Sequence, residues 1–170
     1  MKKIILLFLI PLMGICLRAE EMMPIDRPLN NVSLNLVGDA SLISLNYERL
    51  FFLNDQIFLS GLVGLGYNEE FQLCLFGPCD EPPEKYLNVN FHLSGNFGKG
   101  RHFLEVGLGT TFTTGTISRH MIVYPLLGYR LQPFHTNKIH LRIFASYPII
   151  GLNNIDLLYA PFGVAVGISL

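Results

Sequence analysis

The sequence has few charged residues and no excess of either sign. Of its 170 residues, 15% are charged and 50% are hydrophobic, and the formal net charge at pH 7 is −1. A soluble domain typically carries about 25% charged residues, so this composition is unusual for a chain surrounded by water. Nucleic-acid-binding domains present basic surfaces. A net charge this close to zero gives no indication of a nucleic-acid partner.

Long hydrophobic runs are missing beyond the start of the chain. Lys2 and Lys3 precede an apolar stretch at 4–17, and Ala19 stands at a plausible cleavage point. The stretch is too short for a membrane helix and polar residues follow it, so we interpret residues 1–19 as a secretory signal peptide. The remaining chain has no candidate for a membrane-spanning helix. A closed β-barrel is the other structure that pairs all backbone polar groups inside hydrocarbon.

Cysteine is scarce, with three residues in the whole chain. Cys16 lies in the signal peptide, and a lipid anchor on it is an alternative that the large Ile15 before it disfavours. Cys74 and Cys79, in the stretch CLFGPC, lie in a segment rich in proline and acidic residues. In an oxidising compartment we expect them to form a disulfide within a loop. A redox pair would have two residues between its cysteines, and a metal site would need nearby histidines.

The clearest pattern in the sequence is a strict alternation at 86–97, YLNVNFHLSGNF. Apolar residues occupy one face of this segment, and asparagine, serine and histidine occupy the other. A β-strand sends successive side chains to opposite faces, so the alternation predicts a strand. The polar face carries no Lys, Arg, Asp or Glu, although a strand that faces bulk water usually shows charges. Small uncharged polar groups indicate an enclosed, wet interior.

The same alternation recurs along the chain and predicts eight strands after an irregular lead-in at 20–31. We place these strands at about 32–38, 41–52, 56–68, 86–97, 102–113, 120–132, 139–148 and 159–170. Their number is even, and most have the length that a tilted strand needs to cross a bilayer. The predicted fold class is all-β, an eight-stranded antiparallel up-and-down transmembrane β-barrel over residues 32–170.

The connections between the predicted strands alternate in length. Turns after the second, fourth and sixth strands are short, whereas the loops after the third, fifth and seventh are longer. Outer-membrane barrels show short periplasmic turns and longer outside loops. One connection departs from this pattern, since the turn at 38–40 belongs to the outside set and is very short.

Four charged residues fall on the polar faces of different predicted strands: Glu48, Glu105, Arg130 and Arg142. With the amino terminus on the periplasmic side, the strand directions bring all four near the periplasmic end. An eight-stranded barrel is just wide enough for side chains to fill it, and an unpaired charge there is costly. We therefore expect an ion-paired plug in the lumen, with His140 and Asn46 nearby. A gate or a proton-linked pore is the alternative role.

Three stretches carry a family resemblance: SLNYERLF at 44–51, GKGRHFLEVGLGTTF at 98–112 and GYRLQP at 128–133. With these stretches the sequence resembles the small eight-stranded outer-membrane β-barrel proteins of Gram-negative bacteria, and among them a set that is uncharacterised. The resemblance implies a location in the outer membrane and contact with outer-membrane lipid. It assigns no catalytic role.

The last predicted strand resembles the assembly signal of that family. Outer-membrane barrels end on an amphipathic strand that the barrel-insertion machinery reads. Val166, Ile168 and Leu170 alternate with small residues here, although the family usually ends in an aromatic residue. The resemblance thus implies this machinery as a partner during assembly.

Some barrels of this size are lipid-modifying enzymes that use a serine, a histidine and an acid near the outer rim. Ser118 and His120 lie near that rim, but no acid is placed with them. Nor does the sequence contain metal-ligand spacing, a phosphate loop, a nucleotide fingerprint or a nucleophile elbow. We expect no catalytic residues, no metal and no cofactor.

Three functional hypotheses follow from the sequence. The first is a non-enzymatic integral outer-membrane barrel with a packed polar lumen, acting structurally or through its loops. A second is a soluble lipocalin-like barrel that binds an apolar ligand, which would place the apolar faces inside and charges outside. The third is a lipid-modifying enzyme in the outer membrane.

Overall fold

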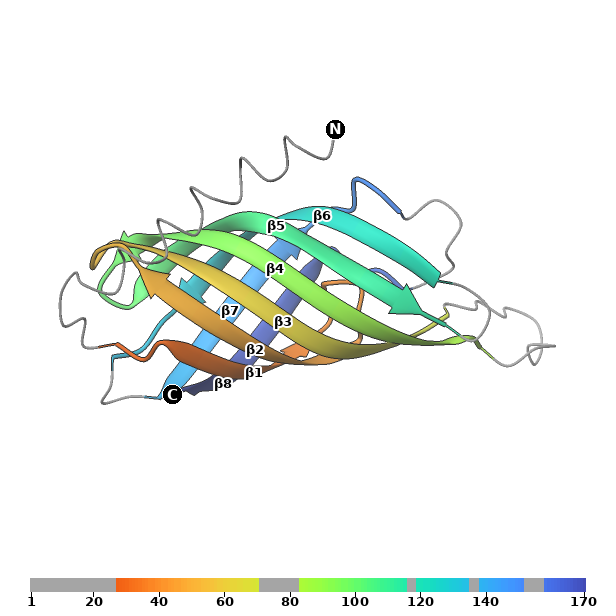
Figure 1. Cartoon of the computed structure of the whole chain (residues 1–170), viewed down its shortest axis with the longest axis horizontal. Helices are drawn as coiled ribbons and strands as arrows, with labels where there is room; N and C mark the ends of the chain where they lie inside the picture. Colours follow the sequence, from red (N-terminus) through yellow and green to blue (C-terminus); the bar gives the residue numbers. More distant parts are fainter. Residues whose placement is uncertain (1–26, 71–82, 116–118, 135–137, 152–157) are drawn as a thin grey trace, which may run out of the picture.

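The protein folds as one closed β-barrel (Figure 1). The computed structural model describes residues 27–70, 83–115, 119–134, 138–151 and 158–170. The predicted signal peptide and the Cys74–Cys79 disulfide lie outside the described residues. No helix among the described residues is long and apolar enough to cross a membrane.

Eight strands form the barrel, each antiparallel to its neighbours in sequence order, and the last strand closes on the first. They are β1 (Asn30–Leu36), β2 (Ile43–Phe52), β3 (Ile57–Glu69), β4 (Lys85–Lys99), β5 (His102–Thr114), β6 (Arg119–Leu131), β7 (Ile139–Ser146) and β8 (Phe162–Ser169). This confirms the predicted all-β fold with eight antiparallel up-and-down strands. The predicted limits differ by a few residues, most at β8, which begins at Phe162 and not near residue 159.

The two ends of the barrel differ in their connections. One end, here called the terminal end, carries Arg27, Leu170 and the connections after β2, β4 and β6. The other, the loop end, carries the connections after β1, β3, β5 and β7, and lies to the right in Figure 1. At the terminal end the β4–β5 turn is tight, because Gly100 adopts a left-handed φ of 65°.

Burial alternates along each strand, with the polar residues inside. Asn90, Asn96 and Glu105 are completely buried in the lumen, whereas Leu65 and Leu87 on the outer wall are 69% and 68% exposed. A protein that folds in water usually shows the opposite distribution. The barrel therefore has a polar interior and an apolar exterior.

The lumen also contains an apolar layer, at the terminal end, that the sequence analysis did not anticipate. It is formed by Leu50, Phe52, Phe58 and Phe103. The ring of Phe58 lies 4.8 Å from the rings of both Phe52 and Phe103, measured between centroids. The guanidinium of Arg27 covers this layer, 5.2 Å from the centroid of Phe103. The interior is therefore polar only in part, whereas we had expected a polar interior throughout.

The short β1–β2 connection bends into the barrel. Asp39 and Ala40 are completely buried, although we expected this turn among the outside connections. Val37, Gly38, Asp39 and Ala40 all have positive φ values, between 43° and 75°. The left-handed conformation costs about 1–2 kcal/mol for each residue other than glycine. Interactions inside the lumen must therefore hold this turn in place.

Truncating the centre of the apolar layer should destabilise the barrel. We expect Phe58→Ala to lower the free energy of unfolding by roughly 3–5 kcal/mol, because it leaves a cavity between two aromatic rings. The matched control is Phe97→Ala on the outer wall, where the side chain is 48% exposed and its removal leaves no internal cavity. Equilibrium urea unfolding measures both. Equal losses for the two variants would contradict a packed layer at this end.

Candidate functional site: the charged network of the lumen

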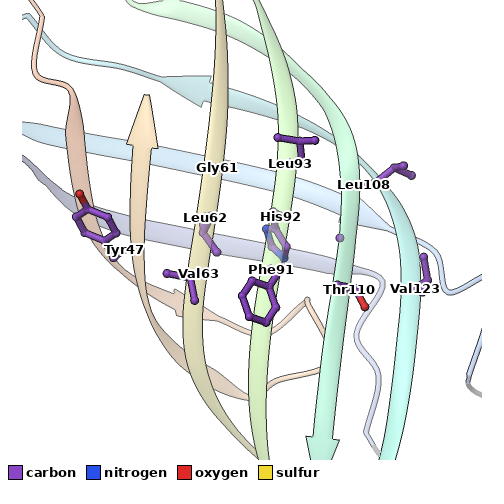
Figure 2. A pocket seen from close by; sticks show the side chains of 11 residues that line it. Tyr47, Gly61, Leu62, Val63, Phe91, His92, Leu93, Leu108, Thr110 and Val123 are labelled. Carbon is purple, nitrogen blue, oxygen red and sulfur yellow. The ribbon is translucent and has the colours of Figure 1, made fainter. Parts of the chain in front are cut away.

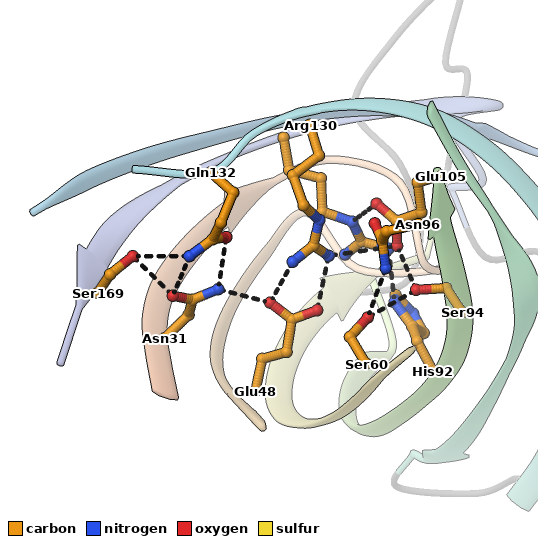
Figure 3. Close-up of polar contacts among 11 residues, drawn as sticks. Asn31, Glu48, Ser60, His92, Ser94, Asn96, Glu105, Arg130, Gln132 and Ser169 are labelled. Carbon is orange, nitrogen blue, oxygen red and sulfur yellow. Dashed lines mark hydrogen bonds and ion pairs between the residues drawn. The ribbon is translucent and has the colours of Figure 1, made fainter. Parts of the chain in front are cut away.

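Four charged side chains meet in the lumen above the apolar layer. Glu48 comes from β2, Glu105 from β5, Arg130 from β6 and Arg142 from β7. All four residues are buried, none with more than 3% of its surface exposed. Figure 3 shows the side chains of Glu48, Glu105 and Arg130 directed toward one another from different walls of the barrel. We call these four residues the charge cluster.

Arg130 connects the two acids of the charge cluster. Its Nη1 and Nη2 donate to Glu48 Oε2 and Oε1 at 2.7 and 2.6 Å, a bidentate pair. The same Nη2 lies 3.4 Å from Glu105 Oε1. Arg142 Nε donates to Glu105 Oε2 at 2.6 Å. Bidentate arginine–carboxylate pairs are among the strongest charge-assisted hydrogen bonds, and here two acids offset two bases.

Aromatic rings complete the surroundings of the two guanidinium groups. The guanidinium carbon of Arg142 lies 4.4 Å from the centroid of Phe144, and that of Arg130 lies 5.7 Å from the centroid of Phe58. Arginine interacts favourably with the faces of aromatic rings, and the interaction strengthens where water is excluded. Phe58 of the apolar layer and Phe144 on β7 thus both stabilise the cluster.

Uncharged polar groups extend the network on both sides of the charge cluster (Figure 3). On one side, Asn31 Nδ2 donates to Glu48 Oε2 at 2.9 Å and also contacts Gln132, which donates to Ser169. On the other side, Ser94 Oγ donates to Glu105 Oε1 at 2.8 Å. The acids of the cluster are therefore fully engaged with partners inside the protein.

A second branch leads from the charge cluster toward the loop end. Arg142 Nη2 lies 3.1 Å from His92 Nδ1, and His92 Nε2 lies 2.9 Å from the hydroxyl of Tyr124. That hydroxyl is in turn 3.0 Å from Thr111 Oγ1. Four strands are linked in this way by side chains that cross the lumen.

This geometry suits a structural role better than a chemical one. A carboxylate that acts as a base or a metal ligand needs a free lone pair, and both acids of the cluster accept ion pairs from arginine. No group of three or more His, Cys, Asp or Glu residues in the described part of the chain is arranged to hold a metal ion. Ser118 and His120 were the two residues expected near the outer rim. Ser118 lies outside the described residues, and only the backbone of His120, on β6, is described.

The outer wall bears a shallow apolar hollow of about 510 Å³. Gly61 lies in it and has no side chain to fill it, and an added Cβ there would meet nothing within 4 Å. Figure 2 shows the side chains of Tyr47, Val63, Phe91 and Leu93 around this position. One of its lining residues, His92, also contacts Arg142 of the charge cluster.

No family model matches the chain, and no similar curated protein or solved structure is found.

The sequence analysis named the four members of the charge cluster, and the structure places them together in the lumen. It named His140 as a neighbour, and this residue is buried on the same face of β7. The extension through Asn31 and Gln132 was missed. Both positions fall in step with the lumen-facing residues of β1 and β6. They stand at the ends of these strands, however, where the alternation gives a weak signal.

Removing one charge from the cluster should cost more than removing a balanced pair. We expect Glu48→Gln to lower the free energy of unfolding by about 3–5 kcal/mol, because the buried charge of Arg130 then loses its main partner. The double variant Glu48→Gln/Arg130→Met keeps the lumen neutral and should recover most of that loss. Urea unfolding of both variants measures the difference. A double variant that is less stable than Glu48→Gln would contradict this account of the cluster.

Proposed function

We propose that the protein is an integral outer-membrane β-barrel whose role is structural or exerted through its loops, with no reaction assigned to it. The observation that carries this proposal is the inverted distribution of polarity, with charged and amide side chains inside and an apolar wall outside. A bilayer is the environment in which such an exterior is favourable, and a closed barrel pairs the backbone there.

The charges on the described outer wall support a membrane-facing band. The outward charged residues of the strands stand at or near strand ends: Arg49, Glu69, Lys85 and Lys99. Arg49 Nη1 donates to Asn30 Oδ1 at 2.8 Å, at the first residue of β1. Between the two ends the outward residues are mostly large and apolar. Such a distribution is typical of a hydrocarbon-facing band flanked by polar rims.

The hollow at Gly61 fits the same proposal. It is lined mainly by apolar side chains, and on a protein in water it would leave this apolar surface hydrated. Next to a bilayer, an acyl chain of outer-membrane lipid would fill it. In the proposal the wall contacts this lipid, and the barrel-insertion machinery assembles the protein.

The two alternatives are supported less well. A lipocalin-like barrel needs an apolar lumen with room for a ligand, whereas the centre of this lumen is filled by the charge cluster. Its apolar layer is confined to the terminal end and is packed ring against ring. A lipid-modifying enzyme would rest on Ser118, which lies outside the described residues.

An arginine in the middle of the wall tests the proposal. We expect Leu108→Arg, at a position that is 60% exposed on β5, to destabilise the inserted barrel by about 2–4 kcal/mol, because the charge would face hydrocarbon. Folding into lipid vesicles, followed by the gel mobility of unheated samples, reports the yield of inserted protein. The matched control is Gln56→Arg, in the exposed β2–β3 turn.

The proposal requires that only the wall variant lose insertion. If Leu108→Arg folds as well as Gln56→Arg, or gains solubility in buffer without detergent, the outer wall faces water and the proposal is wrong.

A further inference from the structure

The β1–β2 turn, residues 37–41, is held inside the barrel by side chains from several strands, and we call it the lumen turn. Asp39 Oδ2 accepts hydrogen bonds from Asn35 Nδ2 at 2.8 Å and from Ser44 Oγ at 3.3 Å. The carbonyl oxygen of Asp39 accepts one from Thr111 Oγ1 at 2.8 Å. The carbonyl of Ala40 accepts from Asn68 Nδ2 at 2.7 Å. Contacts from β1, β2, β3 and β5 thus offset the left-handed backbone of the turn.

Glycines provide the space that the lumen turn occupies. A Cβ on Gly66 would lie 2.3 Å from Ser41 Oγ, and one on Gly163 would lie 2.6 Å from the carbonyl oxygen of Val37. Gly38 itself approaches the backbone of Gly163, where a Cβ would meet Cα at 2.9 Å. Glycines in the barrel wall thus leave room for the lumen turn, and side chains in their place would clash with the inward position of the turn.

Asp39 is buried apart from the charge cluster and from Arg27 at the terminal end, and it has no counterion of its own among the described residues. The charge cluster contains two acids and two arginines, which balance one another. An ionised Asp39 would add a buried negative charge that forms no ion pair within the described part of the chain. An unpaired buried charge is costly, and neutralisation by a proton relieves the cost.

Several hydrogen-bond acceptors around Asp39 have no partner. The Oδ1 atoms of Asp39, Asn35, Asn46, Asn88 and Asn90 have no partner in the protein. The amide nitrogens of these asparagines each donate at least one hydrogen bond elsewhere, for example Asn88 Nδ2 and Asn90 Nδ2 to Ser41 Oγ. A proton on Asp39 would turn one acceptor of this layer into a donor.

The ionisable groups that face the lumen turn are few. Tyr124 and Tyr159 pack with Ala40, and Arg142 acts on Asp39 through its charge. Tyr86 also packs against Ala40, and its hydroxyl donates to Glu84. Burial raises the pKa of the Asp39 carboxyl to about 7, although the charge of Arg142 and the hydrogen bonds from Asn35 and Ser44 act in the opposite direction.

We propose that Asp39 is a proton-binding site that locks the lumen turn inside the barrel, so that the turn is secured when Asp39 is neutral and loosened when it is ionised. No bond other than the carboxyl O–H forms or breaks, and the proton exchanges with solvent. The locked state gains from the proton because the proton removes an unpaired buried charge. The released turn would place Asp39 in water, where its carboxyl is ionised at neutral pH.

Hydrogen exchange of the turn amides tests this proposal on the full folded chain. The N–H groups of Val37, Ser41 and Leu42 are hydrogen-bonded in the inward state and would be exposed in the released one. Between about pH 4 and pH 7 only the inward turn keeps the proton, so release becomes easier as the pH rises. We expect protection, corrected for intrinsic exchange, to fall about tenfold per pH unit from pH 5 to 7 and to level off above.

The variant Asp39→Asn is the matched control, because its amide is neutral at every pH and supplies N–H donors at the same position. Its turn protection should be high and independent of pH over this range. A wild-type protection that is flat between pH 5 and 8, or one that varies equally in Asp39→Asn, would overturn the proposal. Should the variant not fold, the carbon-13 shift of the wild-type carboxyl decides: a midpoint near pH 7 supports the lock, and one below pH 5 overturns it.

Discussion

The bidentate pair between Arg130 and Glu48 is the interaction on which the interior depends. It joins β6 to β2, two strands that are not neighbours in the sheet, and the second contact of Arg130 adds β5. A barrel of eight strands is so narrow that side chains from opposite walls must meet. When those side chains are charged, they have to be paired, because water is excluded. The charge cluster therefore ties the walls of the barrel together.

The other parts of the interior are arranged around this cluster as layers. Toward the terminal end, Phe58 packs below Arg130 and begins the apolar layer, which Arg27 covers. Toward the loop end, Arg142 reaches His92 and Tyr124, and through Thr111 the network arrives at the lumen turn. The central layer is balanced in charge, whereas the layer around Asp39 carries one acid more than it can pair. This contrast makes the loop end the part of the lumen that responds to protonation.

The sequence is highly informative about strands and faces, because a period of two is visible in every strand and a shift of one residue would turn all side chains to the wrong side. The same alternation predicted that Glu48, Glu105, Arg130 and Arg142 face the lumen. It did not reveal the apolar layer, since Phe52 and Phe58 stand at strand ends, where large apolar residues on either face look alike. It also did not reveal the inward path of the lumen turn. Gly38 and Asp39 are ordinary turn residues, and their direction depends on Asn68 and Thr111, which are distant in sequence.

The central claim is that the apolar wall faces lipid. Its most direct test is to express the full chain, with its first 19 residues, in a Gram-negative bacterium and to separate the outer membrane from the periplasm. We predict that the protein is found with the outer membrane and that the unheated sample runs faster on a denaturing gel than the heated one, because the closed barrel resists the detergent. A soluble periplasmic protein with no shift in mobility would contradict the account.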